Sequence, residues 1–99
     1  MQMIECFVKD DNGEFDVHVE VLARAMRPSI PHTVVPSRFG SLTIDVGGER
    51  WVDSSPEPPG LQVSFDDEIE RELAERIVND VITNLASMTG SCFRVVWVS

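Results

Sequence analysis

The sequence predicts an α+β fold in which a mostly antiparallel sheet of five or six strands is packed by one long α-helix. Asn-Gly at 12–13 and Gly-Gly at 47–48 each lie between runs of alternating apolar residues, which is typical of β-hairpins. Apolar residues recur at helical spacing over 66–89, and nearly every residue of 91–98 is apolar. The 99 residues leave room for a single domain, 1–99.

The first hairpin is expected over 2–25, with strands at 2–10 and 14–25 joined at Asn-Gly. This register places a set of apolar side chains on one face, and a slip of one residue would scatter them. It pairs Lys9 with Asp16, Val8 with Val17, Cys6 with Val19 and Ile4 with Val21. The opposite face is mixed, and we expect it to be an oligomer face. Its residues are Met3, Phe7, His18 and Leu22.

Residues 26–37 contain three prolines, which favour an extended, irregular connector over a helix or a central strand. The only locally basic stretch of the chain lies in and around this loop. Arg27, His32 and Arg38 are therefore candidates for a loop site that binds an acidic group or a ligand. Pairing of these bases with neighbouring carboxylates is the alternative interpretation.

A second hairpin is expected over 38–53, with a two-residue turn at Gly-Gly that sets Asp45 opposite Arg50 and Ile44 opposite Trp51. An exposed proline-rich loop is expected to follow at 54–60. The next segment, 61–65, is predicted to be a short strand that leads into the helix.

The long helix is predicted over 66–89, capped by Asp66 or Ser64 and ended by Gly90. Its apolar stripe is wide enough to cover a sheet. The stripe contains Leu73, Ala74, Ile77, Val78, Val81, Ile82 and Leu85. The polar face includes a predicted partner-binding set, Glu68, Glu72, Glu75 and Asn79. The C-terminal strand, 91–98, is apolar on both faces, which predicts a place inside the sheet or cover on both sides.

Acidic residues dominate the charge. The chain has 17 Asp and Glu against 8 Lys and Arg, a formal charge of −9 at pH 7. This balance argues against direct nucleic-acid binding and favours a basic partner. There is no apolar run long enough to span a membrane and no recognisable secretory signal, so we expect a cytoplasmic protein.

The residues that usually carry catalysis are scarce. Cys6 and Cys92 both alternate into predicted core strands, where we expect them to be structural, and the chain has only two histidines. We therefore expect no catalytic residues, no metal and no cofactor, and a non-catalytic protein is favoured over an enzyme.

The leading functional hypothesis is a non-catalytic acidic interaction module, such as a small inhibitor, immunity or adaptor protein, that binds a basic protein surface. One alternative is a structural subunit of a phage-like or scaffold assembly built from copies of itself. A second is a small hydrolase or ligand-binding domain that uses the proline-rich loop. One helix covers only one face of a sheet, so a homodimer or a higher homo-oligomer is also expected.

Overall fold

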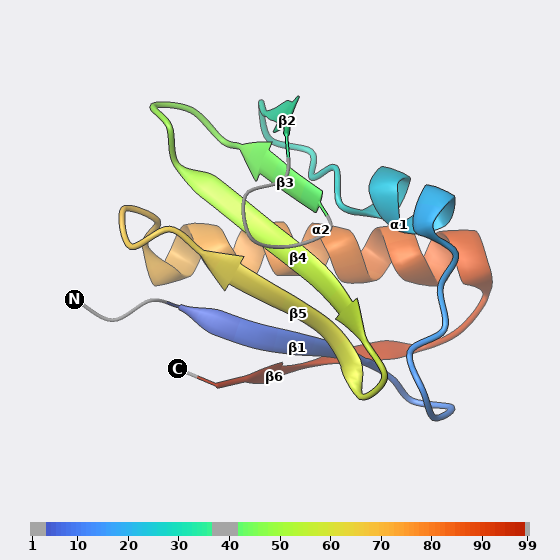
Figure 1. The fold of residues 1–99 in the computed structure, drawn as a ribbon. Helices are drawn as coiled ribbons and strands as arrows, with labels where there is room; N and C mark the ends of the chain where they lie inside the picture. The colour runs from blue at the N-terminus through green and yellow to red at the C-terminus, as the bar shows by residue number, and fades with distance from the viewer. Residues whose placement is uncertain (1–3, 37–41, 99) are drawn as a thin grey trace.

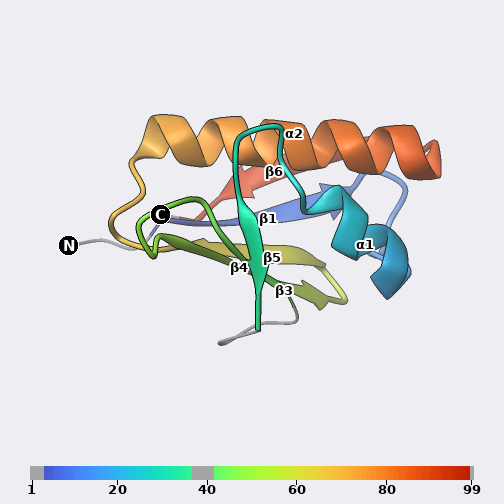
Figure 2. The ribbon, with the colours of Figure 1, turned by 90° about the horizontal axis from the view of Figure 1, so that it is seen from above.

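The computed structural model describes residues 4–36 and 42–98, and it has the predicted α+β architecture (Figure 1). Its elements are β1 (Glu5–Asp10), α1 (Val19–Ala25), β2 (Thr33–Val35), β3 (Leu42–Asp45), β4 (Trp51–Glu57), β5 (Gly60–Phe65), α2 (Arg71–Thr89) and β6 (Phe93–Trp97). All six strands form one antiparallel sheet in the order β2-β3-β4-β5-β1-β6. For the residues that the structure describes, Figure 2 shows α2 along one side of this sheet and no helix on the other side.

The hydrophobic core lies between α2 and the sheet. The predicted stripe of α2 is confirmed: Ala74, Ile77, Val78, Val81 and Leu85 are buried, and Leu73 and Ile82 pack against the core. The sheet contributes every second residue of its central strands, because successive side chains of a strand point to opposite faces. These buried side chains include Cys6, Val8, Val52, Leu61, Val63 and Phe65.

The first predicted hairpin is wrong. A turn forms there, but one residue earlier than expected: the Gly13 N–H donates to the Asp10 carbonyl at 3.2 Å, so Asp11 and Asn12 are the central residues instead of Asn12 and Gly13. The chain after it does not pair with β1, because both edges of β1 are taken by distant strands. Cys6 lies opposite Val63 of β5 on one side and Trp97 of β6 on the other.

The second half of that expected hairpin forms helix α1 instead. Leu22, Ala25 and Met26 have helical spacing and are fully or almost fully buried, so a helix buries this apolar set on one side. His18 caps the helix, since its Nδ1 accepts the Glu20 N–H at 3.1 Å. The alternating apolar residues of this segment favour a strand locally, but long-range strand pairing of β1 and the packing of α1 against α2 determine the structure instead.

The second hairpin is confirmed as β3 and β4, with its register shifted by one residue from the prediction. Asp45 lies opposite Trp51, and Ile44 lies opposite Val52. The loop has three residues, 47–49, because Glu49 also adopts a left-handed conformation, with φ 60°. Residues 38–41 of the predicted hairpin fall outside the described ranges.

Most of the predicted loop 54–60 is sheet. β4 continues to Glu57, β5 begins at Gly60, and the turn is reduced to 58–59. Pro56 is compatible with this arrangement, because β4 bonds to β5 through its odd-numbered residues and the nitrogen of Pro56 points the other way. The short strand predicted at 61–65 is confirmed as β5. The connector 26–37 includes the short edge strand β2.

The start of α2 and the place of β6 in the sheet differ from the prediction. α2 begins at Arg71, five residues later than expected, and Gly90 ends it in a left-handed conformation with φ 77°. β6 is confirmed as a strand, but it lies at the edge of the sheet and buries only one face, since Val96 and Val98 are 41% and 56% exposed. Within the described ranges, neither helix is long and apolar enough to cross a membrane.

Candidate functional site

The densest negative charge of the chain lies in the turn between β5 and α2 and at the start of α2. Residues 66–72, here called the acidic segment, contain five acids and one base. The turn is anchored from both ends: Ile69 is 2% exposed in the core, and its N–H donates to the Asp66 carbonyl at 2.9 Å. The Asp66 carboxylate accepts the N–H of Glu68 at 3.2 Å and of Trp51 in β4 at 3.4 Å. The segment is thus a fixed turn.

The one base in the acidic segment, Arg71, contacts groups outside that segment. The Arg71 Nε lies 3.1 Å from Glu75 Oε2, and its guanidinium lies 4.1 Å from the centre of the Trp97 ring. Four exposed carboxylates remain that form no ion pair with any described residue. They are Asp67, Glu68, Glu70 and Glu72. This arrangement favours a cation from outside the chain.

The predicted acidic face of the helix is only partly a helix face. Glu72, Glu75 and Asn79 are exposed on α2, whereas Glu68 lies in the turn before it. α2 itself is close to charge balance, because Arg71 and Arg76 stand among its acids. The negative charge is therefore concentrated ahead of the helix.

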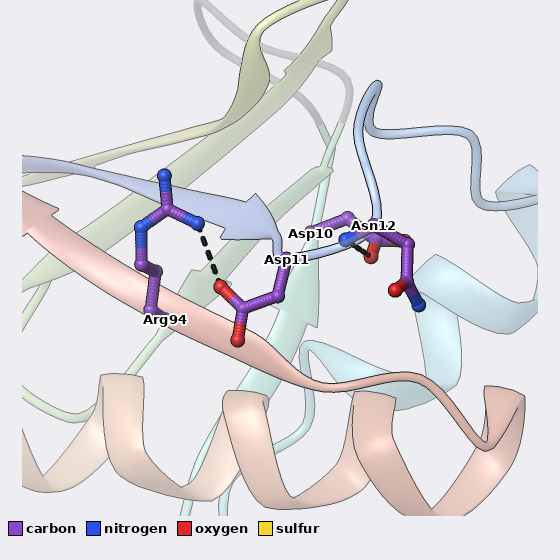
Figure 3. A network of polar contacts seen from close by, with 4 residues as sticks. All are labelled: Asp10, Asp11, Asn12 and Arg94. Atoms are coloured by element: carbon purple, nitrogen blue, oxygen red, sulfur yellow. Dashed lines mark hydrogen bonds and ion pairs between the residues drawn. The ribbon is translucent and has the colours of Figure 1, made fainter.

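A second group of charged residues lies where the turn after β1 meets the β4–β5 turn. An open depression here is lined by Lys9, Asp10, Asp11, Gly13, Glu14, Pro58, Pro59 and Arg94. Asp11 Oδ1 lies 2.6 Å from Arg94 Nη1, and the Asn12 N–H donates to Asp10 Oδ1 at 2.9 Å (Figure 3). With two bases among three acids, this depression is closer to neutral than the acidic segment. Sequence reasoning missed it because Asp11 and Arg94 are 83 residues apart.

The predicted loop site is brought together in part. Arg27 Nε donates to His32 Nε2 at 3.1 Å, and His32 Nδ1 lies 2.9 Å from the Ile30 carbonyl. Because Nε2 is the acceptor, Nδ1 carries the proton and donates to Ile30. Both ring nitrogens are engaged in hydrogen bonds. Arg38 falls outside the described residues.

The predicted oligomer face is not a single surface. Leu22 is fully buried in the core, and His18 is at the start of α1. Phe7 is half-buried on the uncovered face of the sheet, opposite Val96, and Met3 falls outside the described residues. The expected set depended on the hairpin register that does not form.

The two cysteines differ in their surroundings. Cys6 is buried, as predicted, and burial raises the pKa of its thiol to about 12, a rise that Arg71 opposes and Glu5 reinforces. Cys92 is exposed, so its predicted place in the core is wrong. Both are free thiols, and Cys6 has too little thiolate to act as a nucleophile.

Comparison of the chain with known protein families, curated proteins and solved structures gave no match. In the described ranges, no group of three or more His, Cys, Asp and Glu side chains is placed to hold a metal ion. No relative assigns a role to these side chains, so their geometry and charge carry the functional proposal.

Proposed function

We propose that this protein is a non-catalytic interaction module whose acidic segment binds a basic surface of a protein partner. One observation carries the proposal: Asp67, Glu68 and Glu70 are exposed carboxylates on a turn that is anchored to the core and to β4, and Glu72 follows them in the first turn of α2. A fixed turn loses little conformational freedom on binding, and clustered charge accelerates the encounter with an oppositely charged partner.

The state of the other reactive groups supports binding rather than catalysis. Cys6 is buried with a raised pKa, and both nitrogens of His32 are hydrogen-bonded. A basic partner is favoured over nucleic acid because the formal charge of the chain is −9. Two free thiols suit a reducing compartment, and we place the module in the cytoplasm on this ground.

The test is a charge reversal with a matched control. A partner is isolated from native cells with the purified protein, and its affinity is measured over a series of salt concentrations. The double variant Glu68→Lys with Glu72→Lys should weaken binding about tenfold or more. The control, Glu14→Lys with Asp16→Lys, makes the same charge change at exposed residues after the β1 turn and should weaken binding far less.

Two results would contradict the proposal. The first is equal loss of affinity in both double variants, which would indicate a response to net charge alone. The second is an affinity that does not change with salt. Salt screens the attraction between exposed charges, with a Debye length of about 10 Å at 0.1 M salt, so binding through the acidic segment must weaken as salt is added.

A further inference from the structure

The two edges of the sheet are built differently. β2 has three residues between Pro31 and Pro36, so this edge is short and flanked by prolines. β6 has five residues, no proline, no acid and a single charge at Arg94. Natural sheets protect their edges with short strands, prolines and charges, and by these criteria β2 is protected while β6 is open.

The hydrogen bonds between β1 and β6 show which backbone groups of β6 face outward. The Val98 N–H donates to the Glu5 carbonyl, and the Asp11 N–H donates to the Cys92 carbonyl, both at 2.9 Å. In an antiparallel pair every second residue bonds to the neighbouring strand, so the even-numbered residues of β6 bond to β1. The N–H and C=O groups of Phe93, Val95 and Trp97 therefore point away from β1, and β6 is the last strand of the sheet.

We propose that these outward groups pair with β6 of a second copy of this chain, in an antiparallel register centred on Val95. Val95 then lies opposite its own counterpart, and Phe93 lies opposite Trp97 of the second copy. The pairing forms about six hydrogen bonds and joins two six-stranded sheets into one. It also places two aromatic cross-strand pairs on the helix side of the joined sheet.

Charge selects both this occupant and this register. The chain is strongly acidic, yet β6 carries no acid and its one base, Arg94, is paired with Asp11, so two copies can approach at this edge with little local repulsion. With the centre at Val95, Arg94 lies opposite Val96 of the second copy. A centre at Arg94 would set the two arginines face to face, and a centre at Val96 would leave Phe93 without a partner inside β6.

The symmetry of the pairing limits its size. Each copy contributes the same strand, so the interface is isologous and closes at two copies. The free edges of the joined sheet are then the two β2 strands, which are the protected ones. The acidic segment meets the interface only through Arg71, which lies over the Trp97 ring, and its four exposed carboxylates take no part in the strand pairing. The pairing is therefore tested separately from the proposed function.

The first test measures the association of the full chain by sedimentation equilibrium. So small an interface predicts a dimer that forms at about 10 to 100 μM. Val96→Lys places a lysine opposite Arg94 of the second copy and should weaken the dimer about fivefold. Val96→Glu should strengthen it by a similar factor. Val34→Lys is the matched control, because Val34 is an exposed valine (53%) on the other edge strand, and it should leave association unchanged.

The second test traps the register with disulfides. In a Cys92→Ser background, Arg94→Cys combined with Val96→Cys places two thiols across the interface on the uncovered face, at Cα atoms about 4.5 Å apart. Mild oxidation should give covalent dimers for the combined variant and not for either single substitution.

A wild-type chain that remains monomeric at 500 μM (about five times the highest value expected) would overturn the proposal. So would a dimer that responds equally to Val96→Lys and Val34→Lys, since it would lie elsewhere. Covalent dimers from Val96→Cys alone, without a gain in the combined variant, would overturn the register centred on Val95.

Discussion

Asp80 of α2 binds Ser29 through both hydrogen-bond donors of that serine. Its Oδ2 accepts the Ser29 N–H at 2.9 Å and the Ser29 Oγ–H at 2.8 Å. The backbone bond, then the hydroxyl bond, lower the pKa of Asp80 below its usual value, and Arg76 adds to this while burial opposes it. The contact fixes the proline-rich connector to the helix, 51 residues further along the chain.

Asp80→Asn should therefore destabilise the fold in a pH-dependent way. At pH 7 we expect a loss of about 1 kcal/mol in the free energy of unfolding, since a charge-assisted bond becomes a neutral one at a partly exposed site. A carboxyl group whose pKa is lower in the folded state stabilises the fold above its unfolded pKa, about 3.9, and loses this effect as pH falls through the folded value. The difference between wild type and variant should shrink below about pH 4. Urea unfolding at pH 7 and pH 3 measures it.

The control for this prediction is Glu72→Gln. It removes the same charge from an exposed position of the same helix, where the side chain holds no other element of the described structure. Its effect should be smaller at both pH values. A loss for Asp80→Asn that is equal at pH 7 and pH 3 would mean that the carboxylate charge does not contribute.

Asn84 makes the neighbouring contact, at the end of α1. Its Nδ2 donates to the Ala25 carbonyl at 3.1 Å and to the Arg27 carbonyl at 3.2 Å. A seven-residue helix is marginal by itself, so α1 depends on such partners. Asn84→Ala should cost about 1–2 kcal/mol and speed amide exchange over 19–27. Asn79→Ala, on the exposed side of α2, is the matched control, and equal losses in the two variants would contradict the role of the contact.

Gly60 is required for a close approach between β5 and β1. A Cβ atom there would lie 2.8 Å from the Val8 carbonyl oxygen, which is backbone and cannot turn aside. Gly60→Ala should therefore lower the free energy of unfolding by about 1–3 kcal/mol, measured by urea titration. A change within about 0.5 kcal/mol would show that the two strands separate without cost.

The elements predicted correctly are those whose contacts are local in the sequence or whose pattern is long. The α2 stripe repeats over five turns, and the β3–β4 hairpin closes on a three-residue loop, so both are visible in the sequence. The 14–25 segment was predicted incorrectly because its alternating valines fit a strand equally well. Trp97 lies opposite Cys6 because β6 pairs with one edge of β1. This pairing joins strands that are far apart in the sequence, so no local pattern indicates it.

The candidate site was predictable in composition but not in form. The acids of residues 66–72 were evident, yet the expected N-cap, Asp66, instead accepts a hydrogen bond from Trp51 in β4. That contact depends on the sheet register, and it holds the acids in a turn ahead of the helix. The open edge at β6 was equally hidden, because an apolar strand does not indicate its own place in the sheet order.

The two thiols should differ sharply in reactivity. Cys92 is exposed and should react with a maleimide at pH 8, whereas Cys6 is buried with its pKa raised to about 12 and has a thiolate fraction of about 10⁻⁴ at that pH. Mass spectrometry should find one label per native chain and two in denaturant. Cys92→Ser should remove the native label and leave the second. Rapid addition of two labels to the folded wild type would mean that β1 and α2 open readily around Cys6.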